Sequence, residues 1–116
     1  MALPVGGLAK MSCEACRADS PAVPEAEYTV LLETLPGWEI VRVDGVVQLT
    51  KTYTPADFAS ALELANRIGA AAESEDHHPC IVLEWGRLTV SWWTHTIGGL
   101  HMNDFILAAR CEALAA

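Results

Sequence analysis

Basic residues are scarce in this chain. Only 7 of its 116 residues are Lys or Arg, against 15 Asp or Glu, so the formal net charge is −8 with the four histidines counted as neutral. A chain of this charge has no long-range attraction for a phosphate backbone or an anionic lipid surface. We therefore expect no direct binding to nucleic acid, and at this length we expect one domain with one core.

Long apolar runs are also lacking. No stretch approaches the roughly 18 consecutive apolar residues of a membrane span. At the N-terminus Lys10 follows the short apolar stretch instead of preceding it, which is the wrong order for a secretory signal. We expect a soluble, cytoplasmic protein without membrane association, and Met11 is an alternative start that would make residues 1–10 a dispensable tail.

Charged residues of both signs together make up only 19% of the chain, while 52% is apolar and four residues are Trp. The charged share of an ordinary soluble domain is about 25%. Because homo-oligomer interfaces are enriched in apolar and aromatic residues, this composition favours a protein that hides part of its surface in a homo-oligomer.

A second pair of closely spaced cysteines is missing. Cys13 and Cys16 form one CxxC pair, whereas a structural zinc site needs four ligands. We interpret residues 1–23 as a partly ordered tail with reduced thiols, and a metal site completed in an oligomer or a disulfide stays open. Cys80 and Cys111 lie among apolar residues and are predicted to be core residues.

Turn and cap residues divide residues 24–116 into alternating helices and hairpins. Asp44-Gly45 and Gly86-Arg87 each separate two β-rich runs and predict two hairpins. Helices are predicted from Pro24 to Pro36-Gly37, over 55–74 after a Thr54 cap, and over 103–116. The middle helix has an apolar stripe of Phe58, Leu62, Ala65, Ile68 and Ala72. The order α-β-β-α-β-β-α predicts an α+β fold, a four-stranded antiparallel sheet with three helices on one face.

Three of the four histidines are predicted to meet at one edge of this sheet. His77 and His78 precede the third strand, and His95 follows the fourth. Because a hairpin joins these two strands, the start of one and the end of the other are neighbours. His77 and His78 are adjacent in an extended segment, so their side chains point apart and should have different roles.

Imidazoles titrate near neutral pH, so a convergent set of histidines can donate and accept protons in one turnover. Glu73, Glu75 and Asp76 precede the pair and are expected to favour the protonated form of His77. Solvated or capping roles and metal ligation stay open for the three histidines, although adjacent histidines make awkward metal ligands.

Other polar and aromatic residues have simpler interpretations. His101 is interpreted as a solvated loop histidine outside the cluster. Asp104 is interpreted as an acid in the first turn of the last helix, where the helix dipole favours it. Trp38, Trp85, Trp92 and Trp93 are expected in the core or in an interface.

The run Glu73-x3-His77-His78-Pro79-x5-Trp85-x9-His95-x8-Asp104 resembles the signature of the pterin-4a-carbinolamine dehydratase family over 32 residues. The likeness extends over about residues 24–116 and includes the element order. Cys80 is a departure, because a polar or acidic residue is common after the His-His-Pro of this family.

This resemblance implies a hydro-lyase that removes water from a 4a-hydroxytetrahydropterin to give the quinonoid dihydropterin, without metal or organic cofactor. It implies catalysis by His77, His78 and His95. In this scheme His77 and His95 transfer protons, and His78 binds the pterin ring of the substrate. Substrate contacts are implied also for Pro79, Thr94 and Thr96, and supporting roles for Glu73, Asp76, Trp85 and Asp104.

The resemblance also implies a homodimer or homotetramer, and it brings an alternative function. Members of this family bind transcription factors as dimerisation cofactors, so a non-enzymatic partner protein is the main competing hypothesis. A small metal-binding protein that uses Cys13, Cys16 and histidines is a third.

Overall fold

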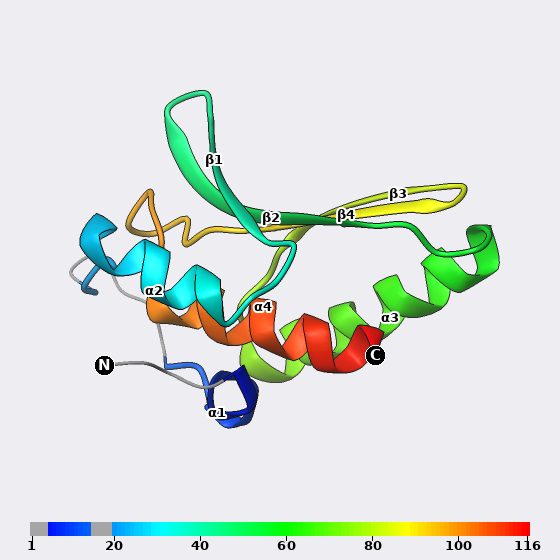
Figure 1. The fold of residues 1–116 in the computed structure, drawn as a ribbon, viewed down its shortest axis with the longest axis horizontal. Coiled ribbons are helices and arrows are strands. Elements are labelled where there is room, and N and C mark those ends of the chain that lie inside the picture. Colours follow the sequence, from blue (N-terminus) through cyan, green and yellow to red (C-terminus); the bar gives the residue numbers. More distant parts are fainter. Residues whose placement is uncertain (1–4, 15–19) are drawn as a thin grey trace.

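The computed structural model describes residues 5–14 and 20–116, and it has the expected α+β architecture with helices layered on one face of the sheet (Figure 1). The four antiparallel strands, in the sheet order β1-β2-β4-β3, are β1 (Glu39–Val43), β2 (Val46–Tyr53), β3 (Cys80–Glu84) and β4 (Arg87–Trp92). The helices are α1 (Val5–Lys10), α2 (Tyr28–Glu33, after a 3-10 turn over Glu25–Glu27), α3 (Phe58–Glu75) and α4 (Met102–Ala115). The predicted element order is confirmed from α2 to α4.

Both predicted hairpins are present, one of them shifted by a residue. Asp44 and Gly45 have φ of 50° and 81° between β1 and β2, as a tight two-residue turn requires. The second turn consists of Trp85 and Gly86, not of Gly86 and Arg87, because Glu84 pairs with Arg87. Gly86 takes the one position with positive φ, 69°, which glycine adopts without strain.

The core lies between the sheet and the helices. Alternate residues of β4, namely Leu88, Val90 and Trp92, are buried, and they belong to one apolar cluster with Leu49 of β2 and Phe105 of α4. Side chains that alternate in this way along a strand place one face of the sheet on the core.

The prediction for α3 was wrong in its start and in part of its buried face. The helix begins at Phe58 because the carboxylate of Asp57 caps it, accepting from Ser60 N at 2.8 Å. Phe58 and Leu62 are exposed, and α3 instead buries Ala61, Leu64, Ile68 and Ala72. These four residues have equally good helical spacing, so spacing alone could not decide between two overlapping stripes.

The segment expected to be a tail carries α1, which packs on α4 and contributes the fully buried Leu8 to the core. Cys111 is buried as predicted, but Cys80 is exposed, because in edge strand β3 it shares the outer face with Val82 and Glu84. Cys16 lies outside the described residues. Within the described ranges, no helix is both long and apolar enough to cross a membrane.

Candidate active site

The β3–β4 hairpin brings the three predicted histidines to one cavity. Cys80 pairs with Ser91, so the residues before β3 and after β4 continue side by side at the same end of the sheet. A cavity of about 390 Å³ lies there, within the usual range for small-ligand pockets. It is lined by His77, His78, Trp93, Thr94, His95 and Thr96, together with Cys13, Glu14, Glu75 and Asp76.

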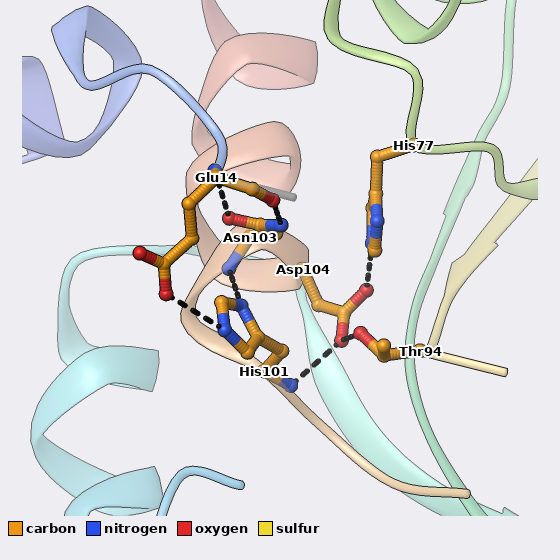
Figure 2. A network of polar contacts seen from close by, with 6 residues as sticks. All are labelled: Glu14, His77, Thr94, His101, Asn103 and Asp104. Atoms are coloured by element: carbon orange, nitrogen blue, oxygen red, sulfur yellow. Dashed lines mark hydrogen bonds and ion pairs between the residues drawn. The ribbon is translucent and has the colours of Figure 1, made fainter. Parts of the chain in front are cut away.

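His77 is held on two sides. Helix α3 ends at Glu75, and its C-cap Asp76 adopts the left-handed conformation with φ of 50°. The chain then turns so that His77 is 8% exposed. Its Nε2 lies 2.7 Å from Oδ1 of Asp104 (Figure 2). The ring is stacked with that of Trp92, with 9° between the planes and 6.0 Å between the centroids. A ring fixed in this way has a defined orientation in the cavity.

Asp104 is fully buried and accepts three hydrogen bonds. Besides His77 on Oδ1, its Oδ2 accepts from the Thr94 hydroxyl at 2.8 Å and from the His101 backbone N–H at 2.9 Å (Figure 2). A buried carboxylate needs such donors to offset its lost hydration. Because an ionised carboxylate only accepts, Nε2 of His77 is the donor in this contact, and in the neutral imidazole Nδ1 then holds the lone pair.

The other two histidines are exposed at the cavity and have different neighbours. Nε2 of His78 lies 2.6 Å from Oε1 of Glu73, one turn back on α3. The His95 ring lies 4.8 Å from the Trp93 ring, centroid to centroid. The three histidines thus have three different environments.

Two of the three acids near the pair contact groups other than His77, and the predicted effect of the acids on His77 stays a prediction. Glu73 contacts His78, and Oε1 of Glu75 accepts from Nη1 of Arg110 at 2.8 Å, a bond that holds the pKa of Glu75 below its usual value. The acid that contacts His77 is Asp104, from 27 residues further along the chain. Sequence proximity is a poor guide here because the helix end points Glu75 towards α4.

Four of the implied site residues do not line the cavity, and two of these, Glu73 and Asp104, contact the lining histidines instead. Pro79 is not among the lining residues, and Trp85 lies in the turn at the far end of β3 with 74% of its surface exposed. A five-residue strand separates Trp85 from the histidine pair.

The interpretation of His101 as a solvated histidine was wrong. Its side chain is 2% exposed and caps α4, with Nδ1 accepting from Asn103 N–H at 3.0 Å. His101 and Asp104 form a reciprocal capping box, a motif that in sequence normally begins with Ser or Thr. The spacing of three residues between His101 and Asp104 was the feature of the sequence that could have indicated this capping box. Cys13 and Glu14, in the segment interpreted as a tail, were also not predicted to line the cavity.

The arrangement suits proton transfer. It offers an imidazole with a free lone pair backed by a buried carboxylate, and two further imidazoles open to the cavity. Among the described residues, no group of three or more His, Cys, Asp or Glu side chains is arranged to hold a metal ion.

Comparisons with known proteins agree on one family. The model of the family described as pterin 4 alpha carbinolamine dehydratase matches residues 21–114. A relative from Marinobacter nauticus is 48% identical over 110 residues, covering 95% of this chain and 99% of its own length, and one from Syntrophotalea carbinolica is 49% identical over 107 residues, covering 92% and 96%. Both are provisionally named pterin-4-alpha-carbinolamine dehydratase.

A solved structure is also similar. The crystal structure described as a transcriptional coactivator/pterin dehydratase from Brucella melitensis superposes with a TM-score of 0.75 at 29% identity, covering 83% of this chain and all of that chain.

Proposed function

Because the chain belongs to the pterin 4 alpha carbinolamine dehydratase family, a family of hydro-lyases, we propose that it dehydrates a 4a-hydroxytetrahydropterin to the quinonoid dihydropterin and so recycles the pterin of aromatic amino acid hydroxylases. The observation that carries the proposal is the single cavity shared by His77, His78 and His95, with the buried Asp104 behind His77.

The reaction requires two proton transfers and no change in oxidation state of the enzyme. The C4a–O bond breaks and its oxygen leaves as water after gaining a proton, while N5 loses its proton to form the new C=N bond. We assign the N5 proton to Nδ1 of His77, since Nε2 is bound to Asp104 and Asp104 stabilises the imidazolium that forms. His95, exposed at the cavity, donates a proton from its own imidazolium to the leaving hydroxyl, and proton exchange with solvent then returns both rings to their starting states.

The remaining site residues have binding or supporting roles in this proposal. His78 holds the pterin ring, and Glu73 orients His78 through the 2.6 Å contact. The backbone at Pro79, Thr94 and Thr96 contacts the ring, and Thr94 also fixes Asp104. Asp76 supports the turn that presents His77, and Trp85 has a supporting role remote from the cavity.

The test is the decay of a 4a-hydroxytetrahydropterin, generated by a hydroxylase, followed by stopped-flow absorbance with and without the protein. We expect clear acceleration by the wild type, and a loss of about 10²–10⁴-fold in kcat for His77→Ala and for His95→Ala, the usual contribution of a positioned acid or base. His78→Ala should mainly raise KM.

Glu25→Ala is the matched control, since Glu25 is exposed and contacts only Arg42, at 3.8 Å, among the ion pairs of the described residues. If His77→Ala and His95→Ala both kept wild-type turnover, the assignment of proton transfer to these residues would be wrong. If the folded wild type gave no acceleration over buffer, the enzymatic function itself would be wrong.

A second candidate function is that of a non-enzymatic dimerisation or assembly partner. The description of the similar Brucella melitensis structure as a coactivator as well as a dehydratase favours it. The two functions differ in the assay above, because a partner protein has no need of the proton-transfer residues. The homodimeric or homotetrameric state, the cytoplasmic location and the division into a tail (1–23) and a domain (24–116) stay predictions.

A further inference from the structure

Residues 8–14, called here the N-terminal segment, precede the part of the chain that the family model matches, yet they are bound tightly to the site. Leu8 is fully buried in the core. Arg110 of α4 donates to Met11 O at 2.6 Å and to Ala9 O at 3.4 Å. Oε2 of Glu75 accepts from Cys13 N–H at 3.3 Å. These contacts lead the segment to the cavity, where Cys13 and Glu14 form part of the wall.

Glu14 is fixed by its backbone as well as by its side chain. Its N–H donates to Oδ1 of Asn103 at 3.1 Å, and its carbonyl accepts from Nδ2 of Asn103 at 2.7 Å (Figure 2). Its Oε1 lies 3.1 Å from Nε2 of His101. Asn103 and His101 are 1% and 2% exposed, so a residue at the surface is joined to two buried residues at the start of α4.

The hydrogen bonds of His101 give its tautomer. Nδ1 accepts from the Asn103 N–H, so it has a lone pair and Nε2 carries the proton that is donated to Glu14. The His101 backbone N–H in turn donates to Oδ2 of Asp104, whose Oδ1 accepts from His77. Figure 2 shows this path without a break from Glu14 through His101 and Asp104 to His77.

We propose that Glu14 is a positioning residue for His77, acting through the capping box at the start of α4. This inference rests on the proposed function for its kinetic test, although the structural coupling can be measured without it. Glu14 holds the His101 ring, which fixes the His101 backbone N–H against Asp104, and Asp104 fixes the tautomer and the orientation of His77. A small displacement of a proton-transfer group is enough to slow a reaction severalfold or more.

The test compares Glu14→Ala with Glu14→Gln in the full-length protein. Gln keeps an oxygen that accepts from His101, whereas Ala removes it. We expect Glu14→Ala to lower kcat three- to tenfold with KM changed less than twofold, and Glu14→Gln to stay within twofold of the wild type. In ¹⁵N NMR, the Nδ1 and Nε2 resonances of His77 should shift in Glu14→Ala and not in Glu14→Gln.

His101→Asn removes the contact between Glu14 and His101 by changing His101 instead of Glu14. Asn is a good helix cap, so α4 is retained, but its shorter side chain does not reach Glu14. We expect it to reproduce the Glu14→Ala effects, and the double variant to add little, because both changes break one contact. Glu112→Gln is the matched control: it removes an ion pair with Lys51 from α4, remote from the capping box, and should leave the His77 resonances unchanged.

The possible outcomes separate this inference from the proposed function. Wild-type kcat and unshifted His77 resonances in both Glu14→Ala and His101→Asn would overturn the positioning role while leaving the dehydratase function intact. Shifts of equal size in Glu112→Gln would also overturn it, because they would show a general response to destabilisation. A wild type that does not accelerate dehydration would contradict the proposed function, and the NMR comparison would still decide the coupling.

Discussion

At the scale of single residues, the buried carboxylate of Asp104 joins three elements. Its donors come from the turn after α3 (His77), the segment after β4 (Thr94) and the cap of α4 (His101). Helix-capping and the orientation of His77 therefore depend on one side chain. An acid in a first helical turn is common for reasons of the helix dipole alone, so the helix-dipole interpretation of Asp104 from sequence was incomplete and not wrong.

Asp104→Asn is expected to weaken both stability and turnover. The amide replaces one acceptor oxygen by an NH2 group, which faces a donor instead of accepting from it. We expect the free energy of unfolding to fall by about 1–3 kcal/mol, the usual cost of an unsatisfied buried polar group. We expect kcat to fall about 10–100-fold, because the His77 tautomer is no longer fixed. Urea unfolding and the stopped-flow assay measure the two effects.

Thr94→Val is the graded control for this prediction, since it removes only one of the three donors to Asp104. Its loss of stability should be smaller than that of Asp104→Asn. Equal urea midpoints for Asp104→Asn and the wild type would contradict the role of Asp104 as the common acceptor.

The sequence predicted the part of the site whose residues are brought together by a hairpin. One tight turn between β3 and β4 was enough to bring His77, His78 and His95 together. His101 was missed because Ser, Thr, Asp and Asn, not His, are the usual caps, and sequence does not show that a ring nitrogen fills this role. The contact of Asp104 with His77 spans 27 residues, and only the packing of α4 against the sheet determines it.

At the scale of secondary-structure elements, α4 connects the site to the opposite end of the sheet. Its first turn carries Asp104, and near its last turn Glu112 accepts from Lys51 at 2.8 Å and from the Tyr53 hydroxyl at 2.5 Å, both on β2. Burial alone would raise the pKa of Glu112, but the hydrogen bonds from Lys51 and Tyr53 outweigh it and the pKa is lowered.

Stability should therefore depend on pH through Glu112. A carboxyl group whose pKa is lowered by folding stabilises the folded state fully above its unfolded pKa, about 4.3, and loses that contribution as the pH falls through the folded value. We expect Glu112→Gln to be less stable than the wild type by about 1 kcal/mol at pH 7, a modest value because the ion pair is partly exposed. The difference should shrink as the pH falls below about 4.

Urea midpoints of the two proteins between pH 7 and pH 3 measure this difference. A gap that stays constant over this range would show that the ionisation of Glu112 does not contribute. Asp57, whose pKa is lowered by its bonds to Ser60, is present in both proteins, so its own titration cancels in the comparison.

Hairpins and long helices were the predictable elements, because Asp-Gly, Gly and Pro residues mark turns and helix ends in the local sequence. Helix α1 was not predicted, since its VGGLAK sequence contains two glycines and is too short for a stable isolated helix. It forms where Leu8 fills the core beside α4, so its stability comes from tertiary packing that no local pattern shows.

At the scale of the whole molecule, the N-terminal segment is hydrogen-bonded to the last helix, although about 100 residues separate them in the sequence. Arg110, with 22% of its side chain exposed, joins Ala9 and Met11 to Glu75 at the end of α3. One guanidinium thus ties three separate parts of the chain beside the cavity. An ammonium could not replace its several fixed donors.

Arg110→Met should release the N-terminal segment while leaving the sheet intact. Met keeps much of the apolar stem but donates no hydrogen bond, so the Met11 and Ala9 carbonyls lose their donor and Glu75 loses its cation. We expect amide hydrogen exchange in residues 8–14 to become at least tenfold faster, and exchange in β2 and β4 to change little, because local opening needs only these contacts to break. The pKa of Glu75 should rise towards an ordinary value, about 4.3. Arg42→Met is the control, since the side-chain contacts of Arg42 with Gly45 and Glu25 are exposed and remote from the N-terminal segment. Equal exchange rates in the two variants would mean that Arg110 does not anchor the segment.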